Sequence, residues 1–214
     1  MKLFGYFRSS TTYRVRIGLN LKGLDYSVAP VNLLEGDHTG FDYTRLNAFQ
    51  TVPALRIGDR TYVQSMAILA ALDDLYPEPP LLPVANDARQ VCRELSFSIA
   101  TEIHAPNNVP VLTYLKREFA AQQDDIKAWY ATWVHKTFAP IEARLAAWKA
   151  PSEFPFGDQP GLFEAVLIPQ IFNARRFEVD MSAYPRLVQI DQQCRTRPAF
   201  EKAHPDIQPD SPKA

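Results

Sequence analysis

Apolar residues in the first part of the chain follow two different spacings. Four short stretches have the alternation or composition typical of strands: residues 2–6, 25–31, 54–57 and 61–63. Gly58-Asp59 separates the last two stretches, which predicts a β-hairpin. Helical spacing is found in residues 13–22, in residues 41–46 and in a run that Ser65 is expected to cap. The predicted order of elements is β-α-β-α-β-β-α.

A proline-rich break at residues 76–83 ends this pattern. Proline interrupts a helix, so we expect a stiff extended linker there. The remainder has helical spacing only, in segments 87–103, 111–119, 126–148, 163–177, 185–196 and 198–203. Residues 206–214 are expected to form an extended tail. We therefore predict an α/β domain at 1–80, a linker at 81–86 and an all-α domain at 87–214.

Composition excludes several classes of protein. The 214 residues are 46% hydrophobic with a net charge of −1, so no broad basic field favours nucleic acid or an anionic membrane. No apolar run approaches the ~20 residues that span a bilayer, and the N-terminus does not resemble a secretory signal. Cys92 and Cys194 fit no metal-ligand spacing and are expected to be reduced, packed thiols of a cytoplasmic protein.

Four consecutive hydroxyl residues, Ser9-Ser10-Thr11-Thr12, lie at the first predicted strand-to-helix junction. Their side chains can cap the free N–H groups of the first helical turn, and the same N–H groups favour an anion. A hydroxyl without an adjacent His or Lys is a poor nucleophile, so the stretch is interpreted as a site that holds the anion of another molecule. Spacing alone leaves a plain serine-rich N-cap as an equal alternative.

The surrounding motif, Phe7-Arg8-Ser9-Ser10-x-x-x-Arg14-Val15-Arg16-Ile17, resembles the signature of zeta-class glutathione S-transferases, which include maleylacetoacetate and maleylpyruvate isomerases. The resemblance runs nearly end to end. It implies a thioredoxin-like N-terminal domain, a helical C-terminal domain, glutathione as cofactor and a homodimer. It also implies that Ser9 donates a hydrogen bond to the glutathione thiolate, with Ser10 and Thr11 beside it as further catalytic candidates. Thr11 stands where the family often has cysteine.

Two further pairs fit a site for glutathione. Val52-Pro53 precedes the predicted hairpin, and the resemblance implies a cis peptide bond with the Val52 backbone pairing with the cysteinyl part of glutathione. Without the resemblance, an ordinary edge proline is favoured. Ser65 begins a predicted helix, which suits a carboxylate. The resemblance implies that Gln64 and Ser65 hold the γ-glutamyl carboxylate, whereas the simpler alternative is a plain cap.

Basic and polar residues suggest where an acidic substrate binds. Arg8 adjoins the hydroxyl run, and a guanidinium binds a carboxylate in a bidentate fork. The resemblance adds Arg176 to an acidic-substrate pocket, so two arginines are expected to meet at a dicarboxylate. A solvated surface charge is the alternative for each. The resemblance also places His104 and Asn108 in the wall of the cofactor and substrate cleft, and no metal is implied.

The buried helix at 163–177 lacks the usual capping residue of this fold. Gly161 stands at its start and offers no side-chain oxygen. We expect a loss of about 1 kcal/mol of cap stability, or a substitute partner such as Asp158.

Taken with these residues, the resemblance implies a glutathione-dependent cis–trans isomerase of a maleyl-type keto acid in aromatic compound catabolism. A broader glutathione transferase acting on electrophiles or α-haloacids uses the same thiolate and remains open. A non-catalytic binding protein of the same fold is a third alternative. The intact set of Ser9, Val52, Pro53, Gln64 and Ser65 argues against that third alternative.

Overall fold

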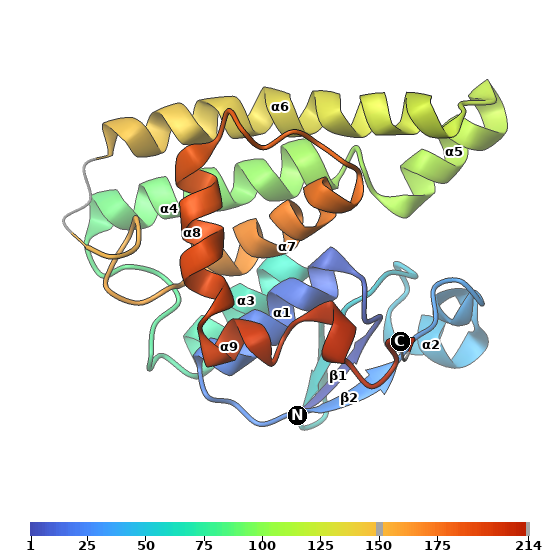
Figure 1. The fold of residues 1–214 in the computed structure, drawn as a ribbon. Coiled ribbons are helices and arrows are strands. Elements are labelled where there is room, and N and C mark those ends of the chain that lie inside the picture. Colours follow the sequence, from blue (N-terminus) through green and yellow to red (C-terminus); the bar gives the residue numbers. More distant parts are fainter. Residues whose placement is uncertain (149–151, 213–214) are drawn as a thin grey trace. The chain divides into compact units, whose positions relative to one another are not determined.

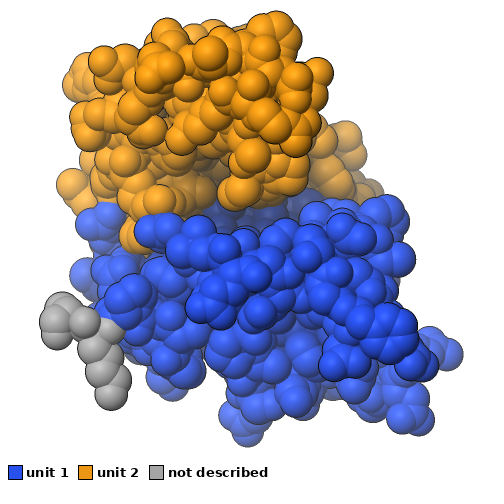
Figure 2. Space-filling model, turned by 90° about the vertical axis from the view of Figure 1, so that its right-hand side faces the viewer, with its two compact units in different colours: residues 1–82, 195–214 blue, residues 83–194 orange. Residues whose placement is uncertain are grey.

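The computed structural model describes residues 1–148 and 152–212, and the chain divides into two compact units. Unit 1 contains Met1–Leu82 together with Arg195–Ala214, and unit 2 contains Pro83–Cys194 (Figure 2). The first division of the chain falls between Leu82 and Pro83. The C-terminal residues, which the sequence pattern assigned to the helical domain, group with unit 1 instead.

Unit 1 is built on a four-stranded mixed sheet (Figure 1). Its strands are β1 (Lys2–Gly5), β2 (Ser27–Pro30), β3 (Ala54–Ile57) and β4 (Arg60–Val63), in the order β2-β1-β3-β4. β1 pairs with β2 in parallel and with β3 in antiparallel orientation, so Leu3 lies opposite Val28 on one side and Leu55 on the other. β3 and β4 form the predicted hairpin around Gly58, whose φ of 56° suits the turn.

Three helices complete the predicted order of unit 1: α1 (Ser10–Leu21), α2 (Phe41–Leu46) and α3 (Ser65–Leu75). A short 3-10 helix, Asp37–Thr39, lies in the segment between β2 and α2. α1 and α3 pack against each other (Figure 1). Their apolar sides form a buried core with the two central strands, made of Leu3, Val15, Leu19, Leu55, Ile68 and Leu72. The β-α-β-α-β-β-α prediction and the thioredoxin-like class are confirmed.

A second apolar cluster of unit 1 lies around α2. Its buried members come from the end of β1, the end of β2, α2 and the segment before β3: Tyr6, Phe7, Val31, Tyr43 and Val52. Successive side chains of a strand point to opposite faces of a sheet, and partly buried Phe4 joins this cluster whereas Leu3 joins the core under α1 and α3. This cluster fixes the segment that contains Val52.

The C-terminal residues pack on unit 1, so the predicted extended tail is wrong for the described residues up to 212. They form α9 (Pro198–Glu201) and a 3-10 helix, Pro205–Ile207. α1 holds this segment from its buried side, because Arg16 Nε donates to the Ala203 carbonyl at 2.9 Å and Asn20 donates to the Ala199 carbonyl at 2.8 Å. The sequence pattern missed this because the anchoring bonds join residues nearly 200 positions apart.

Lys22, at the C-terminal end of α1, anchors the proline-rich segment 76–83. Its ammonium is fully buried and donates to the carbonyls of Tyr76 at 2.7 Å and Pro79 at 2.8 Å. It also lies 2.8 Å from Asp73 Oδ1, which accepts from the Leu81 N–H. A buried ammonium is costly unless it is paired, and here three acceptors satisfy its three hydrogens.

Unit 2 is helical, as predicted. It contains α4 (Asn86–Ser98), a π-helix (Ile99–His104), α5 (Val109–Phe119), α6 (Gln123–Ala147), α7 (Leu162–Arg176) and most of α8 (Pro185–Arg195). α7 is buried along residues 162–171 and packs against α4 and α6. A mostly apolar helix belongs in a core, which agrees with the burial predicted for this segment.

At the start of α7, Glu164 of the same helix compensates for the missing side chain of the N-cap residue. Glu164 Oε2 accepts a hydrogen bond from the Gly161 N–H at 2.7 Å, so the substitute partner is Glu164 rather than Asp158. Glu164 is only 2% exposed, and burial raises its pKa to about 7.

Neither unit carries a membrane-crossing or metal-holding feature in its described residues. None of the helices in 1–148 and 152–212 combines the length and apolar character needed to cross a bilayer. The same residues contain no group of three or more His, Cys, Asp or Glu side chains placed to hold a metal ion. Cys92 and Cys194 are both buried, as expected of packed side chains.

Candidate functional site

Ser9 lies at the N-cap of α1, where the sequence placed the hydroxyl run. Its Oγ accepts from the Thr12 N–H at 3.3 Å, which is the capping bond. The same oxygen lies 2.9 Å from Thr11 Oγ1, and Thr11 Oγ1 donates to the Val52 carbonyl at 2.9 Å. Ser10 is buried in the first turn, whereas Ser9 and Thr11 are half-buried. The structure thus brings Ser9, Thr11 and Val52 together.

The Val52–Pro53 peptide bond is cis, as predicted. The preceding carbonyl, that of Thr51, accepts from both the Tyr43 hydroxyl and Asn47 Nδ2, each at 2.7 Å. Burial raises the pKa of Tyr43 to about 12, so its hydroxyl keeps the hydrogen that it donates. Two side chains from α2 and its C-terminal end therefore hold the Val52 backbone in place beside α1.

The loop between β1 and Ser9 is fixed at Phe7. Its N–H donates to Asp210 Oδ2 at 2.8 Å, and its carbonyl accepts from Arg16 Nη2 at 2.9 Å. Burial lowers the pKa of Arg16 to about 10, which leaves the guanidinium charged at neutral pH. Arg8 follows Phe7 and is half-buried, with its guanidinium carbon 5.6 Å from the centre of the Phe7 ring. Charged residues of α1 and of the C-terminal segment thus position Arg8 and Ser9.

The start of α3 differs in one respect from the prediction. Gln64 occupies the N-cap and Ser65 is the first helical residue, so Ser65 is not the cap. Gln64 is exposed with φ 68° and ψ 114°, a conformation that non-glycine residues rarely adopt. Such strain costs about 1–3 kcal/mol and gathers at functional sites. Buried Ser65 Oγ lies 3.4 Å from Arg14 Nη1, which links this helix start to α1.

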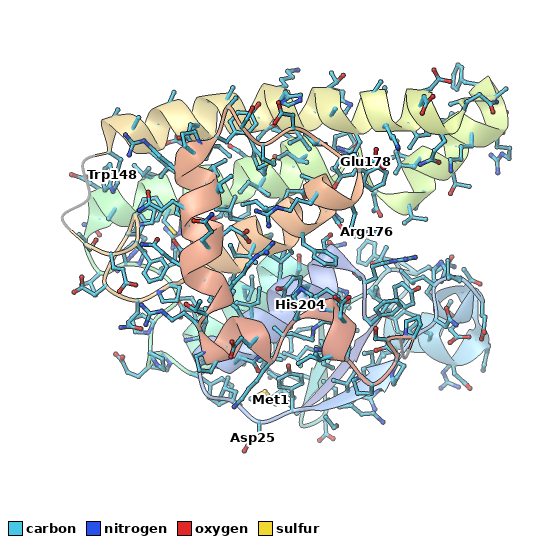
Figure 3. The ribbon with its side chains drawn as sticks, in the orientation of Figure 1. Met1, Asp25, Trp148, Arg176, Glu178 and His204 are labelled. Atoms are coloured by element: carbon cyan, nitrogen blue, oxygen red, sulfur yellow. The ribbon has the colours of Figure 1, made fainter. Side chains whose placement is uncertain are left out.

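The remaining predicted residues belong to unit 2. His104 ends the π-helix and is half-buried, and Asn108 caps α5 by accepting from the Val109 N–H at 2.8 Å. Insertions of the π type are often found at functional sites. Arg176 is the last residue of α7, where Figure 3 labels it, and its side chain is exposed. Its Nη1 donates to Asn173 Oδ1 at 3.0 Å. The meeting of Arg8 and Arg176 at one substrate stays a prediction.

Sequence reasoning overlooked several residues that shape the site. Arg14 and Arg16 were noticed only as parts of a motif, yet both are 1% exposed. Charged residues are almost never fully buried unless they are paired. The sequence does not reveal that these two are buried, because α1 has polar residues on several sides. Tyr43 and Asp210 act on backbone groups, and no local pattern indicates such a contact.

Comparison with known proteins agrees with this geometry. The sequence profile of the glutathione S-transferase N-terminal domain matches residues 8–75. The maleylpyruvate isomerase of a Ralstonia species is 41% identical over 211 residues, which cover 99% of this chain and 100% of that protein. The chain belongs to the zeta-class glutathione S-transferases.

Solved structures of the zeta class extend the likeness to the fold. A holo structure of maleylpyruvate isomerase, a bacterial zeta-class transferase, matches with a TM-score of 0.97 and 41% identity, covering 99% of this chain and 100% of the other. The maleylacetoacetate isomerase of Methylobacterium extorquens, solved with bound malonate and glutathione, matches with a TM-score of 0.94 and 30% identity over 100% of both chains.

Proposed function

We propose that this protein is a glutathione-dependent cis–trans isomerase that converts a maleyl-type keto acid, maleylacetoacetate or maleylpyruvate, to its fumaryl form. Full-length similarity to isomerases of both names supports this activity. The observation that carries it is the link at the start of α1 in which Ser9 contacts Thr11 and Thr11 donates to the Val52 carbonyl. Unit 1 is the glutathione-binding part, and the helical unit 2 is the substrate-binding part.

Unit 1 offers partners for two residues of glutathione, the central cysteinyl residue and the γ-glutamyl residue at one end. The Val52 backbone, fixed before cis Pro53, offers a strand-like partner for the cysteinyl residue. Ser9 lies at the first turn of α1, where free N–H groups favour a negative sulfur. Gln64 and Ser65 lie at the start of α3, which suits the γ-glutamyl carboxylate, and the charge of buried Arg14 adds to that attraction.

The chemistry requires a thiolate at neutral pH, whereas a free thiol has a pKa of about 8.5. Bound glutathione supplies a thiolate that adds to the cis double bond, permits rotation about the resulting single bond and leaves again. Ser9 donates a hydrogen bond to the sulfur, and the helix start adds its positive potential, so both stabilise the charged form. Ser10 and Thr11, the next two residues of the chain, are further catalytic candidates beside Ser9.

The substrate is a dicarboxylate, and arginine is the residue best suited to bind one. Arg8 from unit 1 and Arg176 from unit 2 hold its carboxylates and stabilise the negative charge that develops on the adjacent carbonyl oxygen. His104 and Asn108 contribute to the wall of the cofactor and substrate cleft. The dicarboxylate malonate, bound together with glutathione in the Methylobacterium extorquens relative, supports a substrate of this class.

The biological setting follows from the same proposal. Maleyl keto acids, the substrates proposed here, are products of aromatic ring opening, so the protein acts in aromatic compound catabolism. The proposal places the protein in the cytoplasm, where glutathione is available, and includes the homodimer that the family resemblance implies.

The proposal is tested by offering both cis acids with and without glutathione and following the loss of enol absorbance. Turnover is expected only with glutathione. Ser9→Ala removes one hydrogen bond to the sulfur, and the loss of one such donor lowers kcat by roughly 100-fold with a much smaller effect on glutathione affinity.

Ser27→Ala is the matched control, because Ser27 is an exposed serine of the same unit at the start of β2. It is expected to leave turnover unchanged. If Ser9→Ala keeps full turnover, the role given to Ser9 is wrong. If neither acid is consumed while an electrophile or an α-haloacid is conjugated, the broader transferase function replaces the isomerase. Failure to bind glutathione at all favours the non-catalytic alternative.

A further inference from the structure

Three hydrogen bonds form a continuous chain across the site in unit 1. The Thr12 N–H donates to Ser9 Oγ at 3.3 Å, Ser9 Oγ and Thr11 Oγ1 lie 2.9 Å apart, and Thr11 Oγ1 donates to the Val52 carbonyl at 2.9 Å. Val52 lies 41 positions beyond Thr11 along the chain. The Thr11 hydroxyl therefore links Ser9, the proposed donor to the thiolate, with the Val52 backbone that is proposed to bind the cysteinyl residue.

The directions of these bonds follow from counting hydrogens. A carbonyl oxygen only accepts, so the single hydrogen of the Thr11 hydroxyl points to Val52. The contact between Ser9 and Thr11 must then carry the hydrogen of Ser9. In this arrangement Ser9 directs its hydrogen at Thr11, and the hydrogen is not available to a sulfur atom.

We propose that Thr11 is a positioning residue that couples the Val52 carbonyl to the direction of the Ser9 hydroxyl. The inference rests on the proposed function, because its trigger is glutathione. When the cysteinyl N–H of glutathione donates to the Val52 carbonyl, the Thr11 hydroxyl turns its hydrogen to Ser9. Ser9 is then free to donate its own hydrogen to the sulfur. No covalent bond changes, since both hydroxyls only rotate.

The switched arrangement is favoured by the charges involved. A thiolate is a stronger acceptor than a neutral hydroxyl, so the Ser9 hydrogen moves to the sulfur. Without a compensating rotation, the oxygens of Ser9 and Thr11 would then face each other at 2.9 Å with no hydrogen between them. Rotation of Thr11 removes this repulsion, and the glutathione N–H replaces the donor that Val52 loses.

The switch also strengthens the bond to the sulfur. After the rotation, Ser9 Oγ accepts two hydrogen bonds, from the Thr12 N–H and the Thr11 hydroxyl, while it donates one. Hydrogen bonds in such a chain polarise one another, so a hydroxyl that accepts two bonds is a better donor. Thr11 is therefore expected to lower the pKa of the bound thiol, although its own hydroxyl never contacts the sulfur.

The test compares Thr11→Val, which has the same shape without a hydroxyl, with Thr11→Ser and Thr11→Cys. The pKa of bound glutathione is measured from the ultraviolet absorbance of its thiolate as a function of pH. In Thr11→Val we expect a higher pKa and a thiolate fraction about three- to tenfold lower at neutral pH, matching the loss of one hydrogen bond. Thr11→Ser restores the wild-type pKa, and Thr11→Cys, a weak donor, lies between.

A second ligand separates coupling from simple support of the Val52 segment. S-methylglutathione has no ionisable thiol, so Thr11→Val is expected to bind it nearly as tightly as the wild type does. Equal weakening of both ligands, or an unchanged thiol pKa in Thr11→Val, overturns the inference. If Thr11→Val does not fold, the Ser and Cys variants decide, and identical pKa values in those two also overturn it.

Thr132→Val is the matched control. Thr132 is exposed on α6, and its hydroxyl also donates to a backbone carbonyl, that of Ala128 at 2.8 Å. It is expected to leave the thiol pKa unchanged. Absence of glutathione binding by the wild type contradicts the proposed function itself, which is a different result from binding with no effect of Thr11.

Discussion

Glu164 is expected to make the protein less stable as pH rises from 4.5 to 7. Its carboxyl is 2% exposed at the third position of α7, and Oε1 has no hydrogen-bond partner among the described residues. Burial raises the pKa from 4.5 to about 7, although the N–H groups of Gly161 and of Glu164 itself act in the opposite direction. The folded protein therefore keeps a proton that the unfolded chain releases.

The sign and size of the effect follow from proton linkage. Between pH 4.5 and 7 the folded state binds more protons than the unfolded state, so the free energy of unfolding falls as pH rises. Each pKa unit corresponds to about 1.4 kcal/mol, so the full effect is roughly 3 kcal/mol. The stabilisation is complete below pH 4.5, is lost through the folded-state pKa near 7, and changes no further above it.

Glu164→Gln isolates this contribution. The glutamine oxygen can still accept from the Gly161 N–H, and the neutral amide imitates the protonated carboxyl. Urea unfolding at pH 5 and pH 8 is expected to show similar stability at pH 5 and a variant up to roughly 3 kcal/mol more stable than the wild type at pH 8. Glu35→Gln, at an exposed loop position, serves as the control. Parallel pH curves for Glu164→Gln and the wild type would refute the reasoning.

Two other substitutions test contacts in unit 1. Lys22→Met leaves the Asp73 carboxylate without its buried partner and is expected to cost about 3–5 kcal/mol in urea unfolding. A loss below about 1 kcal/mol would show that the pair is dispensable. Tyr43→Phe removes one of two donors to the Thr51 carbonyl, worth ~1 kcal/mol, so KM for glutathione should rise about fivefold with kcat nearly unchanged. A fall in kcat alone would contradict the anchoring role.

Local sequence patterns were sufficient to predict the fold of unit 1. Alternating and helical spacings were enough for the order of its strands and helices, because each element buries one face and its side chains repeat accordingly. The exact start of α3 was harder to predict from the sequence. Nothing in a glutamine indicates the positive φ of Gln64, so the cap was placed one residue too late, at Ser65. That conformation depends on the surrounding structure rather than on the residue itself.

The capping of α7 shows a different limit. A glycine N-cap was judged by its missing side chain, although the glutamate three residues later can accept from the backbone of the cap residue by itself. The motif at the start of α1 was the opposite case. The resemblance pointed to Ser9 and to cis Val52–Pro53, but their link through Thr11 depends on the three-dimensional structure.

The bond between Phe7 and Asp210 joins residues 203 positions apart, so unit 1 is assembled from two stretches of chain with all of unit 2 between them. During translation, the ribosome synthesises the residues of the sheet and of the first three helices long before it synthesises Asp210. The loop that carries Ser9 therefore lacks its final anchor while the helical unit is being synthesised. The nascent chain completes the proposed glutathione site only after the residues that follow unit 2 have left the ribosome.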